Sequence, residues 1–322
     1  MAAVLAVTFP FFALVLCGYL AAWRRMLPLE AVPGLNGFVL FFALPCMLFR
    51  FGASAPISQL LNPGTLLTWL ACALVMVGFT LAVTLNERVG WNDAAFGALV
   101  AAFPNSGFMG VPLLVALIGA KVAGTVIVTI SVDMIITTSL CLALSRLESA
   151  GPHGASVAAK QALRGMLSNP MPWAIVAGAL FSVLELQLWG PLDKTVGLLA
   201  EAASPVALFT IGAVLARSQI QQKTDSGQVH VASKDYIGVA AIKLFVHPVL
   251  VLVLGASVIS LGWGLDKSAL TVMVLVAALP SASNVSLLAE RYGADNGRVA
   301  RIILVSTALA FFTFSAAVSL MI

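Results

Sequence analysis

Ten runs of about 20 predominantly apolar residues follow one another along this chain, and each run is long enough to cross a bilayer as a helix. Only 9% of the 322 residues are charged, whereas ordinary soluble domains carry about 25%, so the chain cannot cover a water-facing surface. We therefore predict an all-α integral membrane protein with ten transmembrane helices. The predicted spans are 2–23, 33–52, 64–85, 93–118, 122–144, 170–188, 196–216, 236–261, 267–289 and 299–321.

The basic residues fall mainly into one set of loops. Loops after odd-numbered spans, with the helix ends beside them, hold twelve Lys and Arg residues, whereas loops after even-numbered spans hold only Lys121, Lys194 and Lys267. Short loops rich in Lys and Arg stay on the cytoplasmic side of a membrane. We therefore predict a multi-pass protein of the plasma (inner) membrane with both termini outside the cytoplasm.

Several short patterns recur in the two halves of the chain at nearly constant offsets. The matches are Pro10, Gly18 and Leu20 with Pro170, Gly178 and Leu180; PxxLFxxG at 45–52 with 205–212; and LLxxxxGA at 113–120 with 287–294. We interpret 1–144 as a first repeat of five helices, 145–169 as a cytoplasmic loop and 170–322 as a second repeat. Because five is odd, the second repeat enters the membrane from the opposite side, which is the inverted arrangement of many secondary transporters.

Two predicted spans are interrupted at corresponding places by a proline and small polar residues. The first break is AAFPNSG at 101–107 in the fourth span, and the second is AALPSASN at 277–284 in the ninth. Proline removes a backbone donor, and irregular backbone inside a membrane must face protein or water. A break in both halves indicates a transporter's binding site, with a packing kink as the alternative. The predicted substrate-binding residues are Pro104, Asn105, Ser106, Gly107, Pro280, Ser281, Ser283 and Asn284.

Three titratable residues lie inside predicted spans. Asp133, near the middle of the fifth span, is predicted either to bind a proton or Na⁺ or to hold helices together. Lys243 and His247 lie four residues apart and therefore share a helix face. Lys243 could instead extend to the lipid headgroups, and His247 could be a core residue. We assign all three to ion coupling or a charge relay and leave contact between Lys243 and Asp133 open.

Catalytic and metal-binding motifs give no competing interpretation. The sequence contains no GxSxG, HExxH, Walker A or Rossmann pattern in a suitable context, and its four cysteines lack metal-ligand spacing. We predict no enzymatic activity, no metal site and no cofactor apart from H⁺ or Na⁺ as a coupling ion. The net charge of +4 is too small to indicate a nucleic-acid partner.

Four stretches resemble the auxin efflux carrier family, especially its short bacterial members described as malonate or other organic-anion carriers. They are GYLAAWRRMLP at 18–28, FPNSGFMGVPLL at 103–114, KLFVHPVL at 243–250 and LPSASN at 279–284. The resemblance covers essentially the whole chain and implies a fold related to NhaA-type sodium/proton antiporters and bile-acid transporters. It implies a scaffold of spans 1, 2, 6 and 7 and a mobile transport domain of spans 3–5 and 8–10. It also implies that the two breaks cross, with Asn105 and Asn284 beside the substrate, and that the protein forms a homodimer.

These patterns and the resemblance together predict a secondary transporter for a small organic anion, a mono- or dicarboxylate such as malonate. It would work by elevator-type alternating access, with H⁺ or Na⁺ as coupling ion. The alternatives are a cation/proton antiporter on the same fold and a non-transporting membrane sensor or channel. The substrate's identity and the direction of transport are left open.

Overall fold

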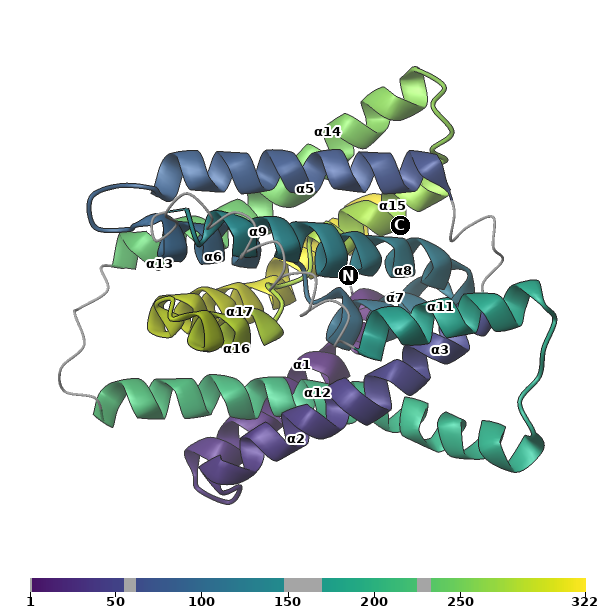
Figure 1. The fold of residues 1–322 in the computed structure, drawn as a ribbon, viewed down its shortest axis with the longest axis horizontal. Helices are drawn as coiled ribbons and strands as arrows, with labels where there is room; N and C mark the ends of the chain where they lie inside the picture. The colour runs from purple at the N-terminus through teal and green to yellow at the C-terminus, as the bar shows by residue number, and fades with distance from the viewer. Residues whose placement is uncertain (1, 55–61, 148–169, 225–232) are drawn as a thin grey trace. The chain divides into compact units, whose positions relative to one another are not determined.

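The computed structural model describes residues 2–54, 62–147, 170–224 and 233–322, and most residues in these ranges are helical (Figure 1). Within the described ranges, seven helices are long and apolar enough to cross a membrane: Ala6–Trp23, Leu29–Ser54, Pro63–Thr84, Ala120–Leu144, Gly190–Gln221, Asp235–Ser260 and Asn296–Met321. Shorter apolar helices, Ser106–Ile118, Pro170–Val183 and Lys267–Ala277, lie in the predicted fourth, sixth and ninth spans. The predicted all-α membrane fold is confirmed, whereas the count of ten spans and the inverted repeats remain predictions.

The chain divides into two compact units. The first unit comprises Met1–Asn62, Ser106–Val128 and Asn169–Gln228. Its elements are α1 (Ala2–Trp23), η1 (Leu29–Ala31), α2 (Val32–Phe38), η2 (Val39–Ala43), α3 (Leu44–Ser54), η3 (Ser106–Gly110), α7 (Val111–Ile118), η4 (Ala120–Val122), the start of α8 (Ala123–Val132), α11 (Pro170–Val183) and α12 (Gly190–Thr224).

The second unit comprises Pro63–Asn105, Thr129–Ser168 and Val229–Ile322. Its elements are α5 (Pro63–Thr84), α6 (Trp91–Ala102), the end of α8, η5 (Asp133–Thr137), α9 (Thr138–Leu144), α13 (Ser233–Ala241), η6 (Ile242–Val246), α14 (His247–Ser260), α15 (Lys267–Ala277), α16 (Asn284–Tyr292) and α17 (Asn296–Met321). The predicted cytoplasmic loop 145–169 lies mostly outside the described residues.

Two closely packed helix pairs form the first unit, α1 with α12 and α3 with α11 (Figure 1). A Cβ atom on Gly18 of α1 would lie 2.7 Å from the carbonyl carbon of Phe209 in α12. A Cβ atom on Gly178 of α11 would likewise meet the carbonyl oxygen of Phe49 in α3. Gly18 matches Gly178 and Phe49 matches Phe209 in the repeated patterns, so equivalent residues make equivalent contacts. Small residues permit this close approach of membrane helices.

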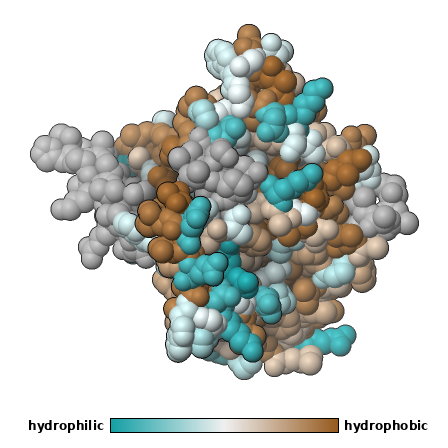
Figure 2. All heavy atoms as spheres, turned by 90° about the vertical axis from the view of Figure 1, so that its right-hand side faces the viewer, coloured by the Kyte–Doolittle hydropathy of each residue, from teal (hydrophilic) through white to brown (hydrophobic). Residues whose placement is uncertain are grey.

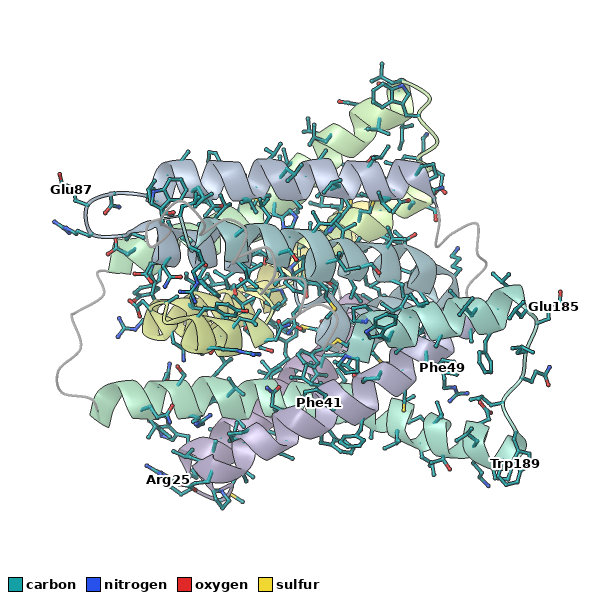
Figure 3. All side chains as sticks on the ribbon, viewed as in Figure 1. Arg25, Phe41, Phe49, Glu87, Glu185 and Trp189 are labelled. Carbon is teal, nitrogen blue, oxygen red and sulfur yellow. The ribbon has the colours of Figure 1, made fainter. Side chains whose placement is uncertain are left out.

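Phe49 also contributes an aromatic contact to its helix pair. Its side chain is labelled in Figure 3. The Phe49 ring meets that of Phe181 edge-on, with the ring centroids 5.1 Å apart. Large apolar side chains such as Phe41, which is 59% exposed, and Trp189, which is 75% exposed, remain on the surface. Hydrophobic residues likewise cover much of the face shown in Figure 2. Exposed apolar surface of this extent is expected of helices that face lipid.

The helix α12 is longer than the predicted span 196–216, because it runs from Gly190 to Thr224. Its 35 residues correspond to about 52 Å, more than the hydrocarbon core of about 30 Å requires. At its start, Pro191 and Asp193 suit the first turn of a helix. At its end, RSQIQQKT contains no glycine or proline that would stop the helix. Hydropathy detects only the apolar middle of this helix.

Four π-helical turns, η2, η3, η5 and η6, widen the described helices. In three of them the turn contains the residue four positions before a proline: Phe41 before Pro45, Phe108 before Pro112, and Leu244 before Pro248. Proline clashes with the carbonyl of that residue, and a wider turn relieves the clash. No proline explains η5, which begins at Asp133. π-Helical turns frequently occur at functional sites.

Candidate functional site

The two predicted breaks meet inside the second unit. Pro104 and Ser281 form an isolated antiparallel bridge between the end of α6 and the segment after α15. Two backbone hydrogen bonds hold it: Asn105 N–H donates to the Pro280 carbonyl (2.8 Å), and Ala282 N–H donates to the Phe103 carbonyl (3.0 Å). Each break therefore satisfies backbone groups that the other leaves without a helical partner, as buried backbone requires.

The crossing is asymmetric. In the repeat alignment Asn105 corresponds to Ser281, but the Asn105 N–H donates to the backbone of the other break, whereas the Ser281 N–H donates to a side chain of α17. The second break also has support from α17, because the Ser281 N–H donates to Ser306 Oγ over 3.2 Å. Sequence reasoning missed Ser306, one of three serines in the apolar helix α17. The two breaks thus present different chemical groups at their meeting point.

Polar side chains of the second break have hydrogen-bonding capacity that the described protein does not use. The Ser281 side chain is fully buried, and its Oγ has no partner among the described residues. The Asn284 Oδ1 is also buried, and the described chain offers it no donor. Buried polar atoms are almost always paired. These two atoms are therefore candidates to bind a polar ligand, near Asn105, which is 3% exposed.

The remaining residues of the predicted site lie further along the two breaks. Ser283 is buried immediately before α16, which begins at Asn284. Ser106 and Gly107 begin η3, which belongs to the first unit. The structure thus brings Pro104 and Asn105 together with residues of the second break, whereas Ser106 and Gly107 belong to another compact unit. Their role in binding remains a prediction.

Asp133 is held on one side only. Its Oδ1 accepts hydrogen bonds from Trp69 Nε1 (3.1 Å) and Thr137 Oγ1 (3.2 Å). Its Oδ2 is buried and has no partner in the described part of the chain. Both Asp133 and Trp69 are fully buried. Sequence reasoning missed Trp69, although a buried indole N–H usually requires an acceptor.

Lys243 connects the titratable residues to the second break. Its Nζ donates to the carbonyl of Ala277 (2.7 Å), the last residue of α15, and lies 3.0 Å from His247 Nδ1. A carbonyl at a helix C-terminus lacks an intrahelical partner, and a cation there is favourable. Lys243 is fully buried, so it does not extend to the headgroups as the alternative interpretation supposed. The His247 ring packs against Trp69, with centroids 5.4 Å apart.

Asp133 and Lys243 do not form a direct ion pair in the described structure; Trp69 instead contacts both Asp133 and His247. The three titratable residues lie in one unit, and the sequence contained no signal for this intervening indole. Whether they bind an ion remains a prediction. The arrangement places a carboxylate, an indole, an imidazole and an ammonium group in one buried chain that ends at the second break.

A buried arginine of α17 joins the first turns of α6 and α13, at the end of α6 away from the crossing. Arg298, 3% exposed, donates through Nη1 to the carbonyl of Asp93 (2.8 Å) and through Nε to the carbonyl of Asp235 (3.0 Å). Asp93 Oδ1 in turn accepts from the N–H of Asp295 (2.7 Å). Here α6, α13, α16 and α17 lie side by side (Figure 1). Sequence reasoning had counted Arg298 only as a cytoplasmic charge.

Comparison with known proteins agrees with these features. Residues 3–318 match the family described as "Membrane transport protein". The chain is 28% identical over 314 residues to a Rhizobium meliloti (strain 1021) protein named "Putative malonate transporter", covering 97% of this chain and 94% of that protein. It is 25% identical over 288 residues to "Uncharacterized transporter YfdV" of Escherichia coli (strain K12), covering 88% and 86% respectively.

An archaeal relative extends the comparison. An "Uncharacterized transporter" of Methanothermobacter thermautotrophicus is 26% identical over 299 residues, covering 92% of this chain and 91% of that protein. The family and these relatives are transporters rather than enzymes, which is consistent with the predicted lack of enzymatic activity. The resemblance seen in the sequence is confirmed: this chain is a multi-pass membrane transporter that belongs to the membrane transport protein family, the family of the auxin efflux carriers.

Proposed function

We propose that this transporter carries a small organic anion, a mono- or dicarboxylate of the malonate type, by alternating access. The observation that carries the proposal is the meeting of two broken helices where the Ser281 Oγ is buried without a described partner. The Ser281 hydroxyl can donate to a carboxylate, and the start of α16 adds the positive end of a helix dipole. Asn105 would supply an amide from the first break. The name of the Rhizobium meliloti relative supports malonate as the first substrate to test.

We propose that the two units are the fixed and moving parts of an elevator mechanism. The first unit contains the predicted scaffold spans 1, 2, 6 and 7, and the second contains the other spans except the segment Ser106–Val128. The matched contacts of Gly18 and Gly178 support a duplicated architecture of ten spans in two inverted repeats. We further propose an inner-membrane protein with both termini outside, and a homodimer formed through the scaffold.

Whether a coupling ion is needed depends on the direction of transport. Moving one negative charge into a cell against the membrane potential costs about 2.3 kcal/mol per 100 mV. Uptake of a dianion would need two cotransported cations to be electroneutral, whereas export would need none. Asp133, Lys243 and His247 are the proposed coupling or relay residues. The unpartnered Asp133 Oδ2 also favours a second candidate, cation/proton antiport on the same fold.

The first experiment is a thermal-shift screen of small carboxylates on the purified protein. A ligand that binds only the folded state raises the apparent Tm, and we expect malonate or a close analogue to do so. Counterflow in proteoliposomes then tests transport, because preloaded unlabelled malonate should accelerate uptake of labelled malonate. A channel or sensor would show no such acceleration, and an antiporter would respond to cations without any carboxylate.

Substitutions in the two breaks test whether the substrate binds where the breaks cross. Asn105→Ala and Asn284→Ala should each weaken the malonate-induced Tm shift and slow counterflow. Asn36→Ala is the matched control, because Asn36 is a buried asparagine of α2 outside both breaks. If both break variants retain the affinity and turnover of the unmodified protein, the substrate does not bind at the crossing.

A further inference from the structure

The two oxygens of the Asp133 carboxylate are used unequally. Oδ1 accepts one hydrogen bond from Trp69 and another from Thr137, whereas Oδ2 is buried and has no partner among the described residues. The backbone carbonyl of Asp133 accepts from Thr138 Oγ1 (2.8 Å). Only Oδ2 is therefore free to take up an additional ligand on this residue.

Two of the groups around Asp133, those of Trp69 and Lys243, disfavour a metal cation there. Metal cations such as Ca²⁺ and Mg²⁺ are held by about six or more oxygen atoms. Trp69 presents an N–H that has no lone pair to offer a cation, and Lys243 presents an ammonium group that repels one. Among the described residues, no three His, Cys, Asp or Glu side chains gather where they could hold a metal ion.

Other titratable groups near Asp133 do not change this conclusion. Among the described titratable groups, Lys243 on η6 and Cys141 on α9 lie within electrostatic range of Asp133. His247 lies beyond Trp69, with its ring against the indole. The helix α6 also contacts η5, and its acidic residue is Asp93 in the first turn. The Asp93 side chain accepts a hydrogen bond from the N–H of Asp295, and its backbone carbonyl accepts one from Arg298.

We propose that the ion bound by Asp133 is a proton rather than Na⁺, and that Trp69 sets this preference by occupying Oδ1. The inference rests on the proposed coupled transport. A proton needs one oxygen, and Oδ2 is available. Binding one proton at Oδ2 converts a buried carboxylate to a neutral carboxyl group and removes the cost of burying its charge. Release of the same proton on the other side of the membrane completes a cycle of one H⁺.

Trp69 acts in this proposal as a positioning residue. Its N–H fixes the carboxylate orientation together with the Thr137 hydroxyl, and without it Oδ1 would keep only the hydrogen bond from Thr137 and could accept a further ligand. Trp69→Phe removes the N–H while retaining an aromatic ring. Trp263→Phe is the matched control, because Trp263 is 67% exposed and lies in the turn after α14. Asp133→Asn keeps the shape of the side chain but cannot titrate.

The decisive measurement needs no substrate. Infrared difference spectra of the lipid-reconstituted protein between high and low pH should contain the C=O stretch of a protonated carboxyl group. We expect this band to be absent in Asp133→Asn, shifted in Trp69→Phe, unchanged in Trp263→Phe, and the same in Na⁺ and K⁺. The proposal is overturned if Na⁺, but not K⁺, displaces the proton from Asp133, or if the folded protein shows no Asp133-dependent band at any pH. Size-exclusion profiles identify variants that fail to fold. If Trp69→Phe fails to fold, the spectra of Asp133→Asn still test whether Asp133 binds the proton.

Transport provides the second readout. With the membrane potential clamped, one proton per cycle allows malonate accumulation of up to about tenfold per pH unit. Asp133→Asn should lose this accumulation, and in the unmodified protein a Na⁺ gradient should drive none. Accumulation driven by Na⁺ through Asp133 would refute the inference. If no carboxylate shows counterflow, the proposed function fails, while the infrared bands still report which ion Asp133 binds.

Discussion

Replacing Gly18 by alanine should force α1 away from α12. The new Cβ would lie 2.7 Å from the carbonyl carbon of Phe209 and closer still to its oxygen, whereas ordinary contacts begin at 3.4 Å. Because both neighbours are backbone atoms, no side chain can rotate to make room, and the helices must separate. Overpacking costs about 1–3 kcal/mol, and the higher helix propensity of alanine returns about 1 kcal/mol.

The net effect should be a loss of stability of up to about 2 kcal/mol. Gly178→Ala should behave similarly, since its Cβ would lie 2.9 Å from the backbone N of Ala53. Gly52→Ala should cost less, because its nearest backbone contact would be 3.1 Å. Gly78→Ala in α5 is the control, because its Cβ would meet no atom within 4 Å.

The measurement is the apparent Tm of each purified variant, followed by size-exclusion chromatography after heating. The expected order, from least to most stable, is Gly18→Ala, Gly178→Ala, Gly52→Ala and Gly78→Ala. Equal Tm values for Gly18→Ala and Gly78→Ala would show that the close approach of α1 to α12 does not exist in solution. Loss at Gly18 without loss at Gly178 would argue against equivalent roles of the two repeats.

Three further substitutions test the second unit. Lys243→Met should lower the apparent Tm and abolish malonate counterflow, because it leaves the Ala277 carbonyl unpaired at a cost of about 1–3 kcal/mol. Adding Asp133→Asn to this variant should recover part of the Tm, since the remaining buried charge is also removed. Arg298→Lys should lower the Tm despite keeping the charge, because an ammonium group cannot reproduce the guanidinium's fixed fork of donors; an unchanged Tm would contradict this. Ser306→Ala should destabilise the protein by about 1–3 kcal/mol and Ser306→Thr much less, as thermal unfolding would show, because only alanine removes the acceptor of the second break.

The sequence predicted where the helices break but not how the breaks are bonded. Proline at 104 and 280 determines the interruptions, because it removes a donor and clashes with the preceding turn wherever the helix lies. The pairing of Pro104 with Ser281 depends instead on how two segments 177 residues apart come together. Local patterns carry no information on such a register, and a shift of one residue leaves the hydropathy of both segments unchanged.

For the buried residues Asp133, Lys243 and Trp69, the sequence likewise predicted part of the arrangement and gave no information on the rest. A carboxylate and a lysine inside apolar spans are expensive in a membrane, so their presence alone indicates that Asp133 and Lys243 face other protein groups or water. Trp69 carried no comparable signal, because tryptophan is common in membrane helices and costs little there. Its role follows only from the hydrogen bond that it donates to Asp133.

The bonds of the second unit favour movement as a rigid body over local closure at the substrate. The half-helices α6 and α16 are tied near the crossing by the Pro104–Ser281 bridge. At their other ends, Asn92 Nδ2 donates to the carbonyl of Gly293 (3.1 Å), and Arg298 joins α17 to α6. Since α6 spans twelve residues, these two sets of bonds are about 18 Å apart. Ligand binding at the crossing should therefore move α6 and α16 together. Bending either half-helix would break hydrogen bonds that no water inside a bilayer can replace.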